Sequence, residues 1–219
     1  MHPLHILYGD GWEMPIASYA LAMLAAYLVG SIPTGYLVAR SHRHVDILQT
    51  GSGRTGATNV LRTLGWKAAL IVFAGDFAKG IAAVAIARVL SNGDPVADVL
   101  AGLMAMAGHT FSIYLGFKGG RGVTTGLAAL TIITPIGALV CAIVAFSTMG
   151  ITRYVSLGSI LGACSVPFTM LGLVLVGIQP PVHLIYGVLA PAFIVLSHKD
   201  NISRLLKGTE RKLGRKAHT

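Results

Sequence analysis

The segment that organises the chain reads GSGRTGATNVLR and runs from Gly51 to Arg62, between two long apolar stretches. Its three glycines allow the backbone to turn N–H groups inward, and its hydroxyl and amide side chains add further donors. Arg54 and Arg62 supply planar guanidinium groups that match phosphate oxygens. Since the segment leads into a helix, whose N-terminal N–H groups and dipole favour anions, it predicts a phosphate-binding loop against a membrane. The alternative is an ordinary loop whose arginines only set the membrane orientation. The candidate binding residues of this loop are Gly51, Ser52, Gly53, Thr58, Asn59 and Arg62.

The composition is that of an integral membrane protein. The 219 residues are 54% hydrophobic and 11% charged, whereas a soluble domain carries about 25% charged residues. The formal net charge is +9, and the basic residues lie between apolar stretches. Membrane orientation and an anionic lipid or substrate therefore explain this charge better than nucleic acid does. We expect one domain over residues 1–219. Cys141 and Cys164 show no metal-ligand spacing, and no metal or cofactor is expected.

The distribution of charge predicts the membrane topology. The polar segments 40–67, 116–122, 151–156 and 198–219 hold 15 of the 17 Lys and Arg residues. The positive-inside rule places all of them in the cytoplasm, which requires an even number of crossings between each neighbouring pair. We therefore expect an all-α bundle with seven transmembrane segments, an extracytoplasmic N-terminus (1–15) and a cytoplasmic basic tail (198–219). The apolar stretches are 16–39, 68–90, 96–115, 123–150, 157–177 and 182–197.

Two of these stretches carry a break. Small residues from Gly30 to Gly35 suit close helix packing or a kink in the first stretch. The stretch 123–150 contains Thr134-Pro135 near its middle, so it forms either two short spans or a re-entrant hairpin. The re-entrant version gives five crossings, and both versions keep the four basic segments on one membrane face.

A second glycine-rich basic loop, from Gly116 to Gly122, precedes the fourth apolar stretch. Its glycines free the backbone, its two basic side chains bring positive charge, and a helix begins at once. This pattern predicts a second anion-binding loop, and hence two phosphorylated substrates or one substrate with two phosphates. The alternative is a basic turn that only obeys the orientation rule. The candidate binding residues of this loop are Lys118, Gly119, Gly120, Arg121 and Gly122.

Several ionisable residues lie inside or at the ends of the apolar stretches. Asp76 and Lys79 are three residues apart near mid-span, so we expect an ion pair that faces the bundle interior. Arg88 is expected to extend to the membrane surface, and His109 to be an interior histidine with satisfied contacts. The segment 210–216 is typical of a solvated basic tail. Gly51-x-Gly53-x-x-Gly56 matches a dinucleotide fingerprint, but it leads into a membrane span rather than a soluble βαβ unit.

Four motifs follow one another along the chain. They are Gly30-Ser31-Ile32-Pro33-Thr34-Gly35; Gly51-Ser52-Gly53 through Gly56-Ala57-Thr58-Asn59; Gly108-His109-x-Phe111 with Phe117-Lys118-Gly119-Gly120-Arg121-Gly122; and His198-x-x-Asn201-Ile202-x-Arg204-Leu205-x-x-Gly208-x-Glu210. Together, and in this order over residues 20 to 212, they resemble the PlsY family of acyl-phosphate-dependent glycerol-3-phosphate acyltransferases of bacterial membranes. The sequence departs from the family pattern at Arg54, Ser112 and Arg121.

The resemblance implies a seven-span enzyme of phospholipid biosynthesis that transfers an acyl group from acyl phosphate to the 1-hydroxyl of glycerol 3-phosphate. It implies no metal and no acyl-CoA, and it adds the peripheral acyltransferase that makes acyl phosphate as a candidate partner. No Ser-His-Asp arrangement is visible, so we expect direct attack, with a substrate phosphate or His198 accepting the proton. The competing classes are an anion or phosphate-ester transporter and a structural membrane scaffold. The implied catalytic residues are Ser52, Arg62, Arg121, Ser156, His198 and Asn201.

Overall fold

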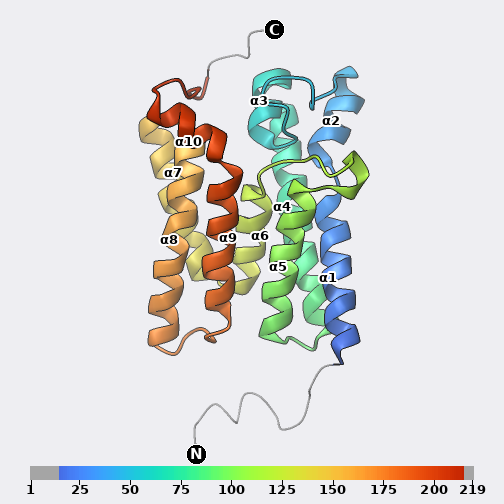
Figure 1. The fold of residues 1–219 in the computed structure, drawn as a ribbon, viewed down its shortest axis with the longest axis vertical. Helices are drawn as coiled ribbons and strands as arrows, with labels where there is room; N and C mark the ends of the chain where they lie inside the picture. The colour runs from blue at the N-terminus through green and yellow to red at the C-terminus, as the bar shows by residue number, and fades with distance from the viewer. Residues whose placement is uncertain (1–14, 215–219) are drawn as a thin grey trace, which may run out of the picture.

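A computed structural model describes residues 15–214 of the chain, and these residues form a bundle of helices (Figure 1). The outer parts of the predicted termini, 1–14 and 215–219, lie outside the described residues. Within the described residues, the β-structure is one isolated bridge between Ser112 and Lys118. The predicted all-α class is therefore confirmed. The elements are α1 (Ile16–Ser31), α2 (Thr34–Arg43), α3 (Ala57–Leu64), α4 (Trp66–Leu90), α5 (Pro95–Thr110), the 3-10 turn η2 (Ile113–Leu115), α6 (Val123–Ile133), α7 (Pro135–Thr152), α8 (Val155–Leu175), α9 (His183–Ser197) and α10 (Lys199–Leu206).

Four stretches of helix are long and apolar enough to cross a membrane. They are Ile16–His42, which joins α1 and α2, and the helices α4, α7 and α8. The helices α6 and α9 are apolar but shorter. Large apolar side chains point outward from the bundle, among them Phe168 at 77% and Leu196 at 73% exposure. Such surfaces are unfavourable in water and suit contact with lipid.

The predicted kink in the first apolar stretch is confirmed. Helix α1 ends at Ser31 and α2 begins at Thr34, because Pro33 lacks an N–H and cannot continue the helix. The glycines beside the break permit two close backbone contacts. A Cβ atom on Gly30 would collide with the backbone of Ala105 in α5, and one on Gly35 would collide with the carbonyl oxygen of Thr55.

The ambiguous stretch 123–150 forms two antiparallel helices, α6 and α7, joined at Thr134 (Figure 1). Pro135 occupies the first turn of α7, and the Thr134 hydroxyl accepts a 3.4 Å hydrogen bond from the Gly137 N–H. At about 1.5 Å per residue, the 11 residues of α6 span roughly 16 Å, which is well short of a bilayer core. This short helix leaves room for a cavity above its N-terminus.

The expectation that Arg88 extends to the membrane surface stays a prediction: the residue lies in the last turn of α4, and its side chain is 43% exposed. Its guanidinium lies 2.7 Å from the carboxylate of Asp98, which is buried in α5, and donates a 2.9 Å hydrogen bond to the carbonyl oxygen of Ile132. Arg88 therefore ties α4 to α5 and to the last turn of α6. Sequence analysis did not single out Asp98, which lies in the first turn of α5.

Two predicted boundaries also differ. Helix α5 ends at Thr110 rather than at Leu115, because Phe111 leaves the helical conformation with a φ of −118° and a ψ of 63°. The irregular loop that follows includes positive φ angles of 59° and 62° at Gly116 and Phe117. His109 therefore lies in the last turn of α5; it is buried as expected, but its Nδ1 has no hydrogen-bond partner among the described residues. In the first basic segment, α3 is a separate short helix that ends at Leu64 and is followed by Gly65, whose φ is 90°. The phosphate-loop candidate thus leads into α3 and not directly into a membrane span.

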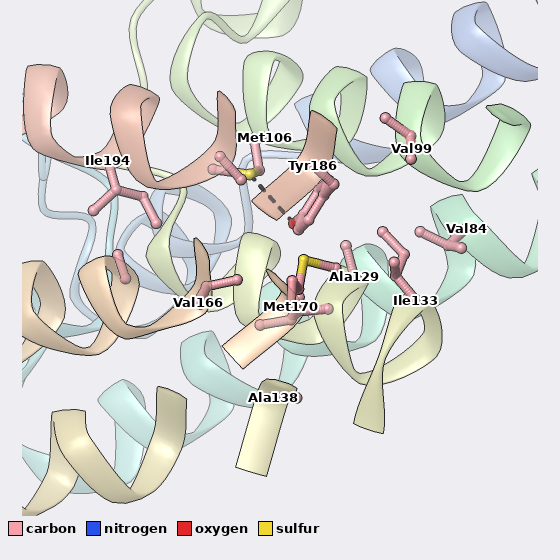
Figure 2. Close-up of a cluster of buried hydrophobic side chains, with 13 residues drawn as sticks. Val84, Val99, Met106, Ala129, Ile133, Ala138, Val166, Met170, Tyr186 and Ile194 are labelled. Atoms are coloured by element: carbon pink, nitrogen blue, oxygen red, sulfur yellow. Dashed lines mark hydrogen bonds between the residues drawn. The ribbon is translucent and has the colours of Figure 1, made fainter. Parts of the chain in front are cut away.

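The polar loops gather at one end of the bundle. Figure 1 shows α2, α3, α10 and the loop between α5 and α6 at the upper end, whereas the α4–α5 and α8–α9 turns lie at the lower end. This grouping is the one that the charge pattern predicted. Below it, Met106, Met170 and Tyr186 are buried in a core cluster contributed mainly by α5, α6, α8 and α9 (Figure 2). The Tyr186 hydroxyl donates a 2.8 Å hydrogen bond to the carbonyl oxygen of Gly126.

Candidate active site

Two neighbouring cavities open among the polar loops. The main cavity has a volume of about 240 Å³ and reaches down between α4, α6, α7 and α8. The outer cavity has a volume of about 260 Å³ and lies between the first glycine-rich loop and α10. All six residues predicted as catalytic line the main cavity, and four of them also line the outer one. The residues common to both cavities are Ser52, Arg54, Arg62, Arg121, Asn201 and Glu210.

Asn59 holds the first glycine-rich loop in shape. Its side-chain oxygen accepts a 2.9 Å hydrogen bond from the Ser52 N–H, and its amide nitrogen donates to the carbonyl oxygens of Ile47, Thr50 and Arg54. Gly51 adopts a φ of 64°, and a Cβ atom there would collide with the Asn59 side chain. Because its amide is engaged by the loop, Asn59 acts as an organiser of the binding surface rather than as a free ligand donor.

The N-termini of two helices face the main cavity. Gly56, Ala57 and Thr58 at the start of α3 line it, as do Val123 and Thr124 at the start of α6. The first N–H groups of a helix lack partners within the helix and carry a partial positive charge. The N-termini of α3 and α6 therefore both favour the binding of an anion in this cavity.

The second glycine-rich loop contributes mainly one side chain, that of Arg121, to the two cavities. Arg121 lines both cavities, and its Nε donates a 3.3 Å hydrogen bond to the carbonyl oxygen of Ser197. Burial, together with the charges of Arg54 and Arg204, lowers the pKa of Arg121 to about 10. The guanidinium stays protonated at neutral pH, but its positive neighbours repel it until an anion binds.

The backbone of this loop does not form the expected open cradle. The N–H of Gly120 donates a 3.1 Å hydrogen bond to the carbonyl oxygen of His109, so it is not free for a ligand. Gly120 lines the main cavity, whereas Lys118 is exposed to solvent. Four residues predicted to bind substrate line neither cavity, and these are Gly53, Lys118, Gly119 and Gly122.

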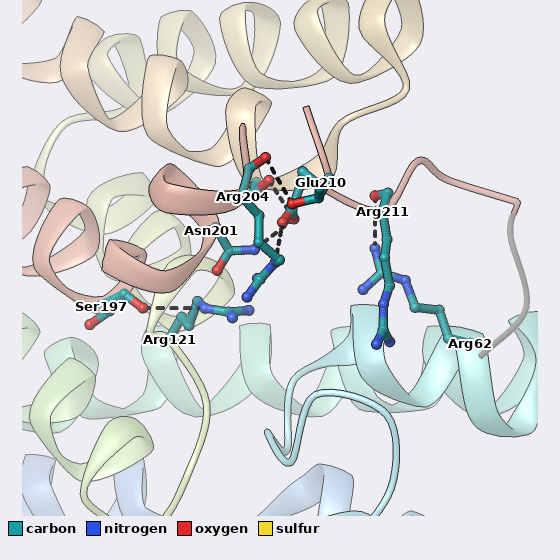
Figure 3. Close-up of polar contacts among 9 residues, drawn as sticks. Arg62, Arg121, Ser197, Asn201, Arg204, Glu210 and Arg211 are labelled. Atoms are coloured by element: carbon teal, nitrogen blue, oxygen red, sulfur yellow. Dashed lines mark hydrogen bonds and ion pairs between the residues drawn. The ribbon is translucent and has the colours of Figure 1, made fainter. Parts of the chain in front are cut away.

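Glu210 organises the third part of the site, and its placement overturns the expectation of a solvated tail for this residue. Its side chain is 4% exposed, and its Oε1 accepts hydrogen bonds from Ser156 Oγ at 2.9 Å and from Asn201 Nδ2 at 2.7 Å. Its Oε2 accepts a 2.7 Å bond from Arg204 Nε (Figure 3). Burial alone would raise the pKa of Glu210, but these hydrogen bonds outweigh burial and leave its pKa below the ordinary value.

The segment after α10 crosses the site as a strap over residues 207–214. Arg62 donates a 3.2 Å hydrogen bond to the carbonyl oxygen of Arg211, as Figure 3 shows. The backbone of Leu213 exchanges hydrogen bonds with Arg153, at 2.7 Å to its carbonyl oxygen and 3.0 Å from its guanidinium. The strap therefore joins α3 to the α7–α8 connection and brings Glu210 into the cavity.

Polar atoms of Arg62, Asn201 and His198 are among those that remain available to a ligand in the cavities. Arg62 Nε and Asn201 Oδ1 are buried without a partner among the described residues. His198 is buried, and its Nδ1 lies 2.8 Å from the carbonyl oxygen of Ile194. A carbonyl oxygen can only accept, so Nδ1 carries the proton and Nε2 is left as an acceptor. Burial, aided by the charges of Arg121 and Arg54, lowers the pKa of His198 to about 4, so the imidazole is neutral at pH 7.

The predicted ion pair between Asp76 and Lys79 is confirmed. Asp76 Oδ1 lies 2.8 Å from Lys79 Nζ, and both side chains are at most 5% exposed. Lys79 also donates a 2.9 Å hydrogen bond to the carbonyl oxygen of Ile32 at the α1–α2 break. Asp76 and His109 line the main cavity, although neither was predicted to belong to the site.

The lower part of the main cavity is apolar. Its lining includes Phe73 from α4, Leu127 from α6, and Phe146 and Met149 from α7. Phe146 is 57% exposed on the outside of the bundle, so this part of the site borders the lipid-facing surface. One site therefore combines a strongly cationic end with an apolar end. A smaller apolar cavity of about 40 Å³ continues from it and shares the lining residues Val123, Leu127, Ala145 and Ser159.

The charge at the outer end is strongly positive. Five arginines line the outer cavity against only two carboxylates, Asp200 and Glu210. Over residues 15–214, no group of three or more His, Cys, Asp or Glu side chains is placed to hold a metal ion. The sequence indicated that Arg204 could face the loops together with His198 and Asn201, but it missed Arg211, because a basic tail normally remains solvated. The five arginines are Arg54, Arg62, Arg121, Arg204 and Arg211.

Comparison with known proteins identifies the family. The glycerol-3-phosphate acyltransferase family matches residues 20–208. The chain is 43% identical over 215 residues to glycerol-3-phosphate acyltransferase 3 of Dehalococcoides mccartyi, covering 93% of this chain and 100% of that protein. It is 42% identical over 208 residues to the glycerol-3-phosphate acyltransferase of Clostridioides difficile, covering 93% and 99%.

Solved structures agree with the sequence relatives. The fold matches the crystal structure of PlsY (YgiH), an integral membrane glycerol 3-phosphate acyltransferase, in its glycerol 3-phosphate form with a TM-score of 0.81 and 37% identity. The match covers 90% of this chain and 96% of that one, and the lysophosphatidic acid form of PlsY matches with a TM-score of 0.80. The resemblance found in the sequence motifs is thereby confirmed: this multi-pass membrane acyltransferase belongs to the glycerol-3-phosphate acyltransferase family of PlsY.

Proposed function

We propose that the protein transfers a fatty acyl group from acyl phosphate to the 1-hydroxyl of glycerol 3-phosphate, giving lysophosphatidic acid and inorganic phosphate. The observation that carries the proposal is a single cavity with an arginine-rich polar end and an apolar end beside the lipid-facing surface. Acyl phosphate has the same two-part character, since it joins a phosphate to a long alkyl chain. The names of the related enzymes support glycerol 3-phosphate as the acceptor and lysophosphatidic acid as the product.

The two phosphates would lie near each other among the arginines. Arg62 offers an unpartnered Nε, and Arg121 reaches both cavities. Ser52, with no side-chain partner among the described hydrogen bonds, and the start of α3 would complete the phosphate-binding surface. A substrate dianion would also relieve the repulsion among the clustered guanidinium groups, which favours binding of a highly charged ligand.

Acyl phosphate is an activated anhydride, so catalysis requires mainly positioning and charge stabilisation. The 1-hydroxyl oxygen attacks the carbonyl carbon, the bond from that carbon to the phosphate oxygen breaks, and the electron pair leaves with the phosphate. The guanidinium of Arg121 stabilises the negative charge on the leaving group. Among the described hydrogen bonds at the cavity, none joins a serine hydroxyl to a histidine, and no acyl-enzyme is proposed.

The hydroxyl proton passes to a substrate phosphate or to His198 Nε2. In the ligand-free protein the low pKa of His198 makes it a weak base. Two bound phosphates would raise that pKa by adding negative charge next to the imidazole. Asn201 Oδ1, which lacks a partner, is suited to accept a hydrogen bond from a second glycerol hydroxyl and so orient the acceptor.

The proposal includes the orientation of the protein in the membrane. Seven crossing segments, with the N-terminus outside and the glycine-rich loops in the cytoplasm, are supported by the basic residues at one end of the bundle and by the break of 123–150 into two helices. The active site would then face the cytoplasm, where a peripheral enzyme that makes acyl phosphate is the expected donor partner. Labelling of single cysteines introduced at positions 52 and 93, after replacement of Cys141 and Cys164, tests this arrangement.

The reaction itself is tested with purified protein in lipid nanodiscs. Palmitoyl phosphate and labelled glycerol 3-phosphate should give lysophosphatidic acid and inorganic phosphate in equal amounts, whereas palmitoyl-CoA should give no product. Product from palmitoyl-CoA alone would overturn the acyl-phosphate donor. Uptake of glycerol 3-phosphate into proteoliposomes without any acylated product would instead establish the transporter class.

A further inference from the structure

His109 lies directly beneath the second glycine-rich loop and contacts it in two ways. Its carbonyl oxygen accepts the 3.1 Å hydrogen bond from the Gly120 N–H. Its imidazole packs against the same glycine, because a Cβ atom built on Gly120 would collide with His109 Nε2 and lie 2.9 Å from Cδ2 and Cε1. The next residue in the chain is Arg121, whose guanidinium reaches both cavities.

The imidazole also contacts helix α4. Its Nδ1 lies 3.5 Å from Asp76 Oδ1, and Asp76 is paired with Lys79. The Thr125 hydroxyl donates a 3.2 Å hydrogen bond to the Asp76 carbonyl oxygen, which joins this group to α6. All of these side chains are buried, so the imidazole has little freedom to move. A rigid chain of contacts thus runs from the interior of α4, through His109, to the backbone that carries Arg121.

The two adjacent glycines of the loop differ in a way that can be tested. At Gly120 the three nearest atoms to an added Cβ all belong to the His109 imidazole, and the residue does not have a positive φ. At Gly119 an added Cβ would instead meet backbone atoms, the carbonyl oxygens of His109 and Thr110. A side chain at position 120 is therefore excluded by one removable side chain, whereas a side chain at 119 is excluded by the backbone.

We propose that His109, buried against Asp76, is a positioning residue that sets the position and direction of Arg121 through its packing against Gly120. On this account the glycine at 120 is required by the imidazole and not by the close approach of a ligand to the backbone. The inference rests on the proposed function, because it takes Arg121 to bind a substrate phosphate. His109 acts on the reaction only through the loop.

The test combines substitutions at the two glycines with His109→Ala. Gly120→Ala should lower kcat/KM by about tenfold or more in the wild-type background, but by less than about twofold in the His109→Ala background. Gly119→Ala is the matched control, and it should lower kcat/KM equally in both backgrounds. An equal loss for Gly120→Ala in the two backgrounds would overturn the proposal and show that the glycine serves the ligand. If Gly120→Ala alone does not fold, the comparison of His109→Ala with the double variant still decides, since a double variant that is unfolded or inactive also overturns it.

A kinetic comparison separates positioning from direct contact. Arg121→Lys shows how kcat and the two KM values change when the guanidinium is lost, and His109→Ala should change the same constants in the same direction by a smaller factor. An effect of His109→Ala on a constant that Arg121→Lys leaves unchanged would mean that His109 touches the reacting groups, which contradicts a positioning role.

Failure of the proposed function has a different signature. A wild-type protein without acyl-transfer activity would refute that function, yet the increase in Tm produced by inorganic phosphate still reports on Arg121. That increase should be lost in Gly120→Ala and regained in the His109→Ala/Gly120→Ala variant. A double variant that fails to regain it would overturn the inference independently of any activity.

Discussion

Asn201 Nδ2 donates a 2.7 Å hydrogen bond to Glu210 Oε1, which joins the first turn of α10 to the strap that follows this helix. The same carboxylate accepts hydrogen bonds from Ser156 in α8 and from Arg204 in α10. Three elements of the site thus depend on one buried charge. Because Glu210 uses the donors of Ser156 and Asn201, the atom of Asn201 left for a ligand is the acceptor Oδ1.

Replacing Glu210 with Ala should destabilise the protein by about 3–5 kcal/mol, because it leaves the buried donors of Ser156 and Asn201 and the Arg204 guanidinium without their acceptor. The Tm of the purified protein and its acyltransferase activity should both fall. Asp200→Asn is the matched control, since Asp200 is an exposed carboxylate of α10 that lines the same outer cavity as Glu210. A Glu210→Ala protein with the wild-type Tm would show that this carboxylate does not hold the strap.

Arg121→Ala should lower turnover by about a hundredfold or more while leaving the protein folded and inserted. Its stability should be unchanged or slightly raised, because the substitution removes repulsion from Arg54 and Arg204. Lys118→Ala removes the same charge from the same loop, but Lys118 is exposed and lines neither cavity, so its activity should stay near that of wild type. Equal losses in the two variants would mean that the loop acts only through its total charge.

The low pKa of His198 predicts that the ligand-free protein loses stability in acid. Its pKa is about 4 in the folded protein against an ordinary value of 6.5, so the unfolded chain takes up a proton first as the pH falls. Stability contributed by the neutral imidazole is complete above pH 6.5 and is lost between there and pH 4. The expected fall in Tm over this range is about 5–10 °C. A His198→Gln variant should show a smaller fall, and an identical fall would assign the effect to other groups.

The ion pair between Asp76 and Lys79 should be costly to break on one side only. Asp76→Ala leaves the buried Lys79 ammonium without its counter-charge and should cost about 3–5 kcal/mol. The double variant Asp76→Leu/Lys79→Met removes both charges and should recover most of the lost stability. Thermal unfolding in detergent compares the three proteins. A double variant no more stable than Asp76→Ala would show that the contact of Asp76 with His109 and the hydrogen bond of Lys79 to Ile32, rather than the ion pair, dominate.

Much of the fold follows from hydrophobicity and charge. The break at Pro33, the division of 123–150 at Thr134-Pro135 and the gathering of the basic loops at one end were all predicted from local signals. These signals are strong because proline and mid-span charges have few tolerable placements in a membrane helix. The end of α5 was placed five residues too late, because Phe111 to Leu115 are mostly apolar and only the backbone angles at Phe111, Gly116 and Phe117 reveal the loop.

The candidate site was predicted in part. Side chains that carry their own chemistry, such as Arg62 and His198, could be recognised in their motifs, and the structure brings them to one cavity. The role of Glu210 could not be predicted, because it depends on the strap folding back over 54 residues to Ser156. The glycines at 119 and 120 were assigned to ligand binding, whereas their contacts with α5 are visible only in three dimensions.

The central claim is that two phosphorylated substrates bind together among the arginines and react directly. Initial rates of the purified protein, measured while palmitoyl phosphate and glycerol 3-phosphate are both varied, test this claim most directly. We predict double-reciprocal plots that intersect, as a ternary complex requires. Parallel lines, which indicate release of phosphate before glycerol 3-phosphate binds, would contradict it.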